Sequence, residues 1–198
     1  PAILALAINA NISVLQWGRR TSKTEAFLAL RSLNLVSKMP GSFGAMVSPT
    51  YKKIEEDLLP GLKRGWERFG YIENVDYVVG KSRIPEQQNW DNCLAMLNDY
   101  THVVRFKNGS SIKFLSQDTK VTNVGISLDW LIIDEAKKIK YDKLKAEIIP
   151  ALSGNFVKFG HLAEHRSITI ASDAHMGDKD SNWFMKYKTL VNPELISV

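Results

Sequence analysis

The sequence predicts an α/β fold with a mostly parallel central sheet flanked by helices, and three observations support this. Apolar runs of strand length alternate with longer runs whose apolar residues recur at helical spacing. The strand runs are apolar at nearly every position, as expected for strands buried on both faces of a parallel sheet. Neither an internal repeat nor a long linker divides the chain, so we expect a single domain over 1–198.

Each element follows from its local pattern. The predicted strands are 12–17, 44–50, the two arms of a β-hairpin near 103–115 that turns at Asn108-Gly109, 128–135 and 165–173. The predicted helices are 25–38, 51–70 with an interruption around Pro60-Gly61, 85–100, 136–152, and 181–190 with Ser181 as its cap.

Composition limits the classes of function. The 198 residues are 44% hydrophobic, which is enough for one sizeable core, and no apolar run reaches the length of a membrane span. The net charge of +5 permits contact with a polyanion but does not require it. The single cysteine, Cys93, excludes an internal disulfide, argues against a cysteine-based metal site and fits a reducing cytoplasm.

A polar loop between a predicted strand and a predicted helix nearly matches the phosphate-binding pattern G-x-x-x-x-G-K-[ST]. Trp17 and Ser22 stand at its two glycine positions. A serine there costs on the order of 1 kcal/mol if the position needs a positive φ. The predicted nucleotide-binding residues are Gly18, Arg19, Arg20, Thr21, Ser22, Lys23 and Thr24.

These residue types are suited to binding a nucleoside triphosphate. The loop would supply backbone N–H groups and the positive end of a helix to the phosphates. Lys23 would reach the β- and γ-phosphates, the Thr24 hydroxyl would bind Mg²⁺, and Arg19 and Arg20 would add charge near the γ-phosphate. A basic helix start with no ligand is the alternative.

Two further strands end in polar residues. The run LIIDEA places Asp134 and Glu135 at the carboxyl edge of the sheet, where open α/β folds bind ligands. Asp134 would hold Mg²⁺ through water, and Glu135 would orient and deprotonate the attacking water. The run SITIASD ends in Ser172 and Asp173, candidates for sensing the γ-phosphate. The alternatives are an acidic helix start and a turn or helix cap.

Taken in order, GRRTSKT, VSPTYKKIEEDLLPGL, the stretch from FKNGSS to LIIDEAKKI, and ITIASDAHMGDKDSNWFMKY resemble the ATPase domain of the tailed-phage terminase large subunit. The resemblance covers most of the chain. It implies a P-loop NTPase fold of the ASCE or RecA-like type and Mg²⁺-dependent ATP hydrolysis, with Glu135 and Arg19 or Arg20 catalytic. Ser172 and Asp173 would couple hydrolysis to DNA movement. Val124 departs from the family, many members of which have an arginine there.

The resemblance also implies partners. They are double-stranded DNA, contacted through its backbone without regard to sequence, a portal protein, a small terminase subunit, and further copies of the chain in a ring, usually a pentamer. An isolated domain can be monomeric. The motor would act in the host cytoplasm on the viral procapsid, not in a membrane, and the family's C-terminal nuclease domain is expected to be absent. A helicase-like nucleic-acid-dependent ATPase and a catalytically silent nucleotide-binding or ring-assembly module stay open as alternatives.

Overall fold

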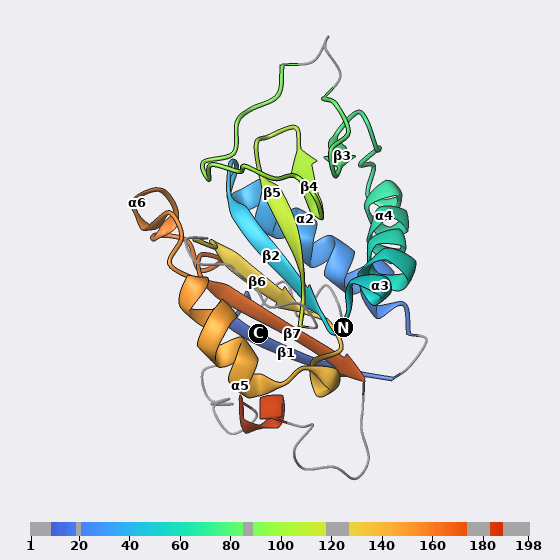
Figure 1. Ribbon diagram of the computed structural model, residues 1–198, viewed down its shortest axis with the longest axis vertical. Helices are drawn as coiled ribbons and strands as arrows, with labels where there is room; N and C mark the ends of the chain where they lie inside the picture. Colours follow the sequence, from blue (N-terminus) through green and yellow to red (C-terminus); the bar gives the residue numbers. More distant parts are fainter. Residues whose placement is uncertain (1–8, 19–20, 85–88, 118–126, 174–182, 188–198) are drawn as a thin grey trace.

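The computed structural model describes residues 9–18, 21–84, 89–117, 127–173 and 183–187. Within them, seven strands form one sheet (Figure 1). In chain order the strands are β1 (Ile12–Trp17), β2 (Phe43–Ser48), β3 (Tyr77–Val79), β4 (Val103–Phe106), β5 (Ser111–Ser116), β6 (Trp130–Ile133) and β7 (Ser167–Asp173).

The order of the strands across the sheet is β1-β7-β6-β2-β5-β4-β3. The first five of these are mutually parallel, and only β4 and β3 run antiparallel to their neighbours. The mostly parallel sheet and the hairpin near 103–115 are therefore confirmed. Gly109 has a φ of 80° in the hairpin turn, a conformation that glycine adopts without steric cost.

The described helical segments are mostly short pieces that join into longer runs. The first run joins the π-helical segment Lys23–Leu28 to α2 (Ala29–Lys38), and the second joins α3 (Tyr51–Lys53), the π-helical segment Ile54–Leu58 and α4 (Leu59–Arg68). The 3₁₀ turn Ala136–Lys138 stands by itself. The last run joins α5 (Tyr141–Lys143), the π-helical segment Leu144–Ile148 and the 3₁₀ turn Ile149–Ala151, and α6 (Phe156–Phe159) follows it. Among the described residues, we find no helix with the length and apolar character to cross a membrane.

The interruption predicted at Pro60-Gly61 is wrong, because 51–68 is one continuous helical run. Pro60 lies in the first turn of α4, directly after the π-helical segment. There the N–H of Leu59 bonds to the carbonyl of Ile54, one residue further back than in an α-helix. This wider turn shifts the carbonyl that a proline ring would otherwise meet, so the helix absorbs Pro60 without breaking.

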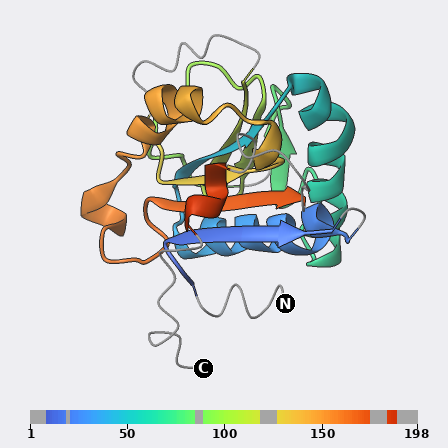
Figure 2. The same ribbon diagram turned by 90° about the horizontal axis from the view of Figure 1, so that it is seen from below.

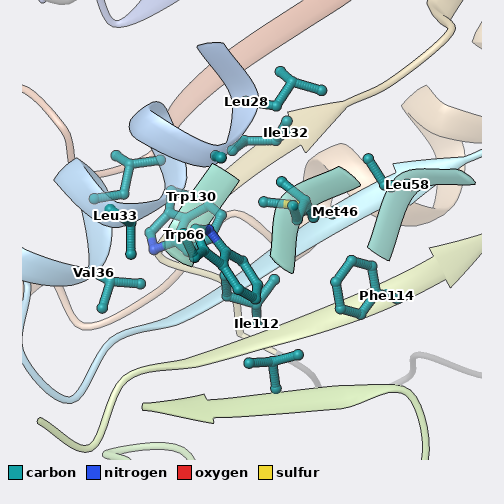
Figure 3. Packing of buried hydrophobic residues seen from close by; sticks show 14 of the residues in the cluster. Leu28, Leu33, Val36, Met46, Leu58, Trp66, Ile112, Phe114, Trp130 and Ile132 are labelled. Carbon is teal, nitrogen blue, oxygen red and sulfur yellow. The ribbon is translucent and has the colours of Figure 1, made fainter. Parts of the chain in front are cut away.

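Two hydrophobic layers enclose the sheet, because successive residues of a strand point to opposite faces. Met46 and Ile132 lie in the layer beneath α2 and α4, whereas Val47 and Ile133 lie in the layer beneath the helical turns 141–151. Figure 2 shows α2 and those turns on opposite sides of β1 and β7. Figure 3 shows the first layer, in which Trp66 and Trp130 are fully buried, as a packing role predicts.

The predicted helix at 85–100 is wrong for the residues that the structure describes, because 89–100 is irregular. Cys93, Ala95 and Leu97 pack against the second layer, whereas Met96 is 98% exposed. This alternation has the period of an extended chain. Backbone bonds to Gly41 and to the end of the hairpin hold the segment there in place of helical bonds.

The predicted helix at 136–152 is broken. Its first turn, Ala136–Lys138, is separated from the turns at 141–151 by an extended Lys140. Gln117 accepts the backbone N–H of Lys140 and donates to its carbonyl, which fixes the break. Of the predicted helix 181–190, residues 183–187 form a short 3₁₀ turn, and the cap Ser181 lies outside the described residues.

Candidate functional site

The predicted phosphate loop connects β1 to a helix, as the pattern requires. β1 ends at Trp17, and the helical run begins at Lys23. Ser22, at the second glycine position, has φ 54° and ψ 27°, the left-handed conformation that usually selects glycine. The Ser22 carbonyl accepts the N–H of Ala26 and so forms the first helical turn. Arg19 and Arg20 lie outside the described residues, so the roles predicted for them stay predictions.

The ends of three neighbouring strands bring the predicted residues together. Lys23 Nζ lies 3.3 Å from Asp173 Oδ1, at the end of β7, and 3.7 Å from Asp134 Oδ1, directly after β6. Parallel strands end at one edge of the sheet, and β7 lies between β1 and β6. The loop, Asp134 and Asp173 therefore lie close together at one edge of the sheet.

The ionised form of the Asp134 carboxyl is disfavoured by its burial. Its side chain is buried, and its Oδ1 accepts no hydrogen bond from any described residue. Burial raises the pKa of the carboxyl to about 6, although the neighbouring Lys23 ammonium lowers it. A buried carboxylate oxygen without a hydrogen-bond donor is suited to accept a cation or a water that a cation holds.

Glu135 is held by two lysines. Its Oε1 lies 3.0 Å from Lys53 Nζ and its Oε2 lies 2.7 Å from Lys138 Nζ. Burial alone would raise the pKa of Glu135, but Lys138 and Lys53 outweigh it and lower the pKa. Glu135 itself has φ 51° and ψ 45°. A left-handed conformation is uncommon for glutamate and is typical of residues whose placement serves a site.

Ser172 and Asp173 are held by Lys137, a residue that the sequence analysis did not single out. Lys137 Nζ lies 3.2 Å from Asp173 Oδ2, and the backbone N–H of Lys137 donates to Ser172 Oγ over 3.3 Å. Lys23 and Lys137 outweigh burial and lower the pKa of Asp173. The end of β7 is thus linked directly to the residues that follow Asp134 and Glu135.

Lys23, Asp134, Glu135 and Asp173 line one cavity of about 750 Å³. Its lining is mostly polar and charged, and it comprises Gly18, Thr21, Ser22, Lys23, Thr24, Glu25, Lys53, Asp57, Leu58, Gly61, Arg64, Asp134, Glu135, Lys138 and Asp173. The volume is within the range of small-molecule and cofactor sites. Every predicted nucleotide-binding residue that the structure describes lines this cavity.

The residues that line the cavity are compatible with a nucleoside triphosphate and Mg²⁺. Among the described residues, no group of three or more His, Cys, Asp or Glu side chains is placed to hold a metal ion. Mg²⁺ typically binds through one or two protein groups together with substrate phosphates and waters, so such a group is not needed. Thr24 and Asp134 are the residues that would hold it, and the ion would neutralise charge on the phosphates.

Lys53, Lys137 and Gly61 are residues of the site that sequence reasoning missed. Lys53 and Lys137 each belong to a pair of adjacent lysines in a stretch whose charges are typical of a solvent-exposed helix face. The sequence therefore does not indicate that they contact the site. Gly61 lies where an added Cβ would come within 2.9 Å of Thr24 Cγ2, so it permits α4 to approach the loop. Only tertiary contacts reveal these three roles.

The fold is similar to that of solved structures of phage large terminases and their ATPase domains. No protein-family model matches the sequence, and a comparison with curated proteins gives no match. Solved structures do match. The large terminase ATPase domain of Thermus phage P74-26 is 22% identical with a TM-score of 0.54, over 94% of this chain and 68% of that one.

A second similar structure is the large terminase of bacteriophage HK97. It is 15% identical with a TM-score of 0.58, over 96% of this chain but only 36% of the HK97 chain. A mutant of the P74-26 domain matches with a TM-score of 0.54 and 22% identity, over 94% of this chain and 69% of that one. At these identities the similarity establishes the fold.

Proposed function

We propose that this chain is the ATP-hydrolysing motor domain of a viral terminase large subunit, which drives double-stranded DNA into a procapsid. The observation that carries the proposal is the position of Lys23. The loop before its helix nearly matches the phosphate-binding pattern, and the Lys23 ammonium lies 3.7 Å from Asp134 and 3.3 Å from Asp173 in one cavity. The similarity to two terminase structures supports the choice of motor.

The proposed reaction is in-line attack of water on the γ-phosphorus of ATP. Glu135 orients the water and accepts its proton, and the bond to the β-phosphate oxygen breaks, leaving ADP and phosphate. Lys23 stabilises the charge on the phosphates, with Arg19 or Arg20 assisting. Ser172 and Asp173 sense the γ-phosphate and couple its loss to DNA movement. Most of the catalysis comes from positioning and charge.

The proposed partners follow from the motor function. Double-stranded DNA is contacted through its phosphates, a portal protein and a small terminase subunit bind the assembled motor, and copies of the chain form a ring in the host cytoplasm. A backbone-tracking motor loses DNA affinity log-linearly as salt rises. Equal binding of duplex DNA at 50 mM and 200 mM salt would refute backbone tracking.

The deciding experiment is titration calorimetry with ATP and Mg²⁺. The wild-type chain should bind, and Lys23→Ala should reduce affinity by roughly 100-fold, since about 3 kcal/mol is typical of a charge-assisted contact to phosphate. Lys52→Ala is the matched control, because the Lys52 side chain is 79% exposed and its ammonium lies 3.9 Å from Glu56 Oε1, away from the cavity lining. Absence of binding by the wild type would refute the proposal.

Turnover separates the motor from a silent module. Glu135→Ala should retain ATP binding and lose about 10²- to 10⁴-fold in turnover, the usual contribution of a general base. If wild-type and variant rates are equally negligible even with DNA present, the chain is a silent module. Strand separation on a forked duplex would instead indicate a helicase-like ATPase.

A further inference from the structure

One continuous helical run, 51–68, which extends from α3 to α4 in Figure 1, contributes residues from Lys53 to Arg64 to the lining of the candidate site. Near its beginning, Lys53 reaches Glu135 on the far side of the cavity, 3.0 Å from Oε1. In its later turns, Gly61 and Gly65 pack against the helix that follows the phosphate loop. The run therefore spans the distance between the loop and the carboxylate proposed as the base.

The contact at the later turns is close and rigid. A Cβ at Gly65 would lie 2.4 Å from both the carbonyl oxygen of Glu25 and the Cβ of Ala29, so only glycine permits this approach. Arg64 Nε lies 2.6 Å from Glu25 Oε1, and Arg68 lies 3.2 Å from Oε2 of the same carboxylate. The phosphate-loop helix and α4 therefore pack closely together beside Thr24.

Lys53 is also held by contacts within its own helix. Thr50 caps the helix, and its side chain accepts the backbone N–H of Lys53 over 3.1 Å. The ammonium also contacts Asp57 Oδ2 at 2.9 Å, one turn further along. The side chain is only 25% exposed. A cation with two carboxylate partners and a capped backbone has little freedom to leave Glu135.

Lys138, the second lysine that pairs with Glu135, is close to it in sequence and more exposed than Lys53. It is a sequence neighbour of Glu135, and its side chain is 50% exposed. It moves with Glu135 and cannot fix that residue relative to the phosphate loop. Lys53 comes from a different element, so among the described ion pairs of Glu135 it is the Lys53 contact that ties the carboxylate to the helix touching the loop.

We propose that Lys53 is a positioning residue for Glu135, holding that carboxylate at a set distance from the phosphate loop through helix 51–68. The inference rests on the proposed ATPase function. Displacing a catalytic group by about 1 Å reduces turnover by on the order of 100-fold. Removing Lys53 should therefore lower kcat much more than it weakens ATP binding.

The test compares Lys53→Met, Lys53→Arg and the matched control Lys52→Met. Lys53→Met should lower kcat by about 10- to 100-fold and change the Kd for MgATP by less than about threefold. Lys53→Arg keeps the charge and should recover most of the rate. Lys52→Met should behave as wild type, since its side chain is 79% exposed and points to Glu56. Thermal melting establishes that each variant is folded.

A double mutant adds a second readout. If Lys53 acts through Glu135, adding Lys53→Met to Glu135→Gln should leave the residual rate unchanged. An unchanged kcat in Lys53→Met overturns the inference, as does a loss confined to MgATP affinity, which would make Lys53 a phosphate ligand. These results leave the ATPase function intact. A wild-type chain that neither binds nor hydrolyses ATP overturns both proposals.

Discussion

Replacing Asp134 by asparagine should stabilise the fold at neutral pH. Burial raises the pKa of Asp134 to about 6 from an ordinary 3.8. At 1.36 kcal/mol for each pKa unit, that difference corresponds to about 3 kcal/mol of destabilisation once the carboxyl is ionised. Asparagine keeps the shape and carries no charge, so it avoids this cost. The melting temperature of the Asp134→Asn variant should be about 6–12 °C higher than that of the wild type, for a chain of this size.

The sign of the pH dependence follows from proton binding. Between pH 3.8 and about 6 the folded chain keeps a proton on Asp134 that the unfolded chain has released. Unfolding therefore releases a proton, and the wild-type stability falls as pH rises through this window. The advantage of Asp134→Asn should be absent below pH 4 and complete above about pH 7.

The assay is urea unfolding at 25 °C from pH 4 to 8, in the presence of a chelator so that no divalent metal contributes. The difference in free energy of unfolding between wild type and variant is plotted against pH. Parallel curves, or a variant less stable than wild type at pH 7.5, would show that Asp134 is not strained by its burial. The cation-accepting role argued for this carboxylate would then lose its physical basis.

Further predictions concern the loop, a helix contact and the cysteine. Ser22→Gly should raise the free energy of unfolding by about 0.5–1 kcal/mol, since glycine adopts the observed φ of 54° without steric cost; a loss of stability on urea unfolding would contradict this. Gly65→Ala should cost about 1–3 kcal/mol, more than Gly61→Ala, because its Cβ would lie 2.4 Å from both the Glu25 carbonyl oxygen and the Ala29 Cβ, whereas at Gly61 the nearest atom is the Thr24 methyl group at 2.9 Å; equal melting temperatures would refute that ranking. Burial raises the pKa of the Cys93 thiol, so alkylation at pH 8 should be slow in the folded chain and fast in urea.

The site was predictable where strand ends carry the chemistry. Apolar runs end at Asp134 and Asp173, and a third run leads into the loop with Lys23. Because parallel strands end at one edge, these residues have to converge once the sheet forms. The loop pattern likewise identified Ser22 as a position under backbone constraint, which its left-handed conformation bears out.

Contacts made by helix surfaces were not predictable in this way. Lys53 and its neighbour Lys52 look alike in sequence, yet Lys53 reaches Glu135 and Lys52 is largely exposed. Which of two adjacent lysines faces a cavity depends on the rotation of the helix about its axis, and packing determines that rotation. The helix predicted at 85–100 failed for a related reason, because apolar residues two apart fit an extended chain lying on a core.

The position of β7 in the sheet has a mechanical consequence. β7 is bonded to β1 along six residue pairs and to β6 along four, and Asp173 is in register with Trp17 at the start of the loop. A slip of one residue would turn every side chain of β7 to the opposite face, so the strand cannot slide gradually. The backbone of Asp173 is therefore held in register with Trp17, so a gradual change in the distance between Asp173 and Lys23 requires a movement of the loop or a rotation of one of the two side chains.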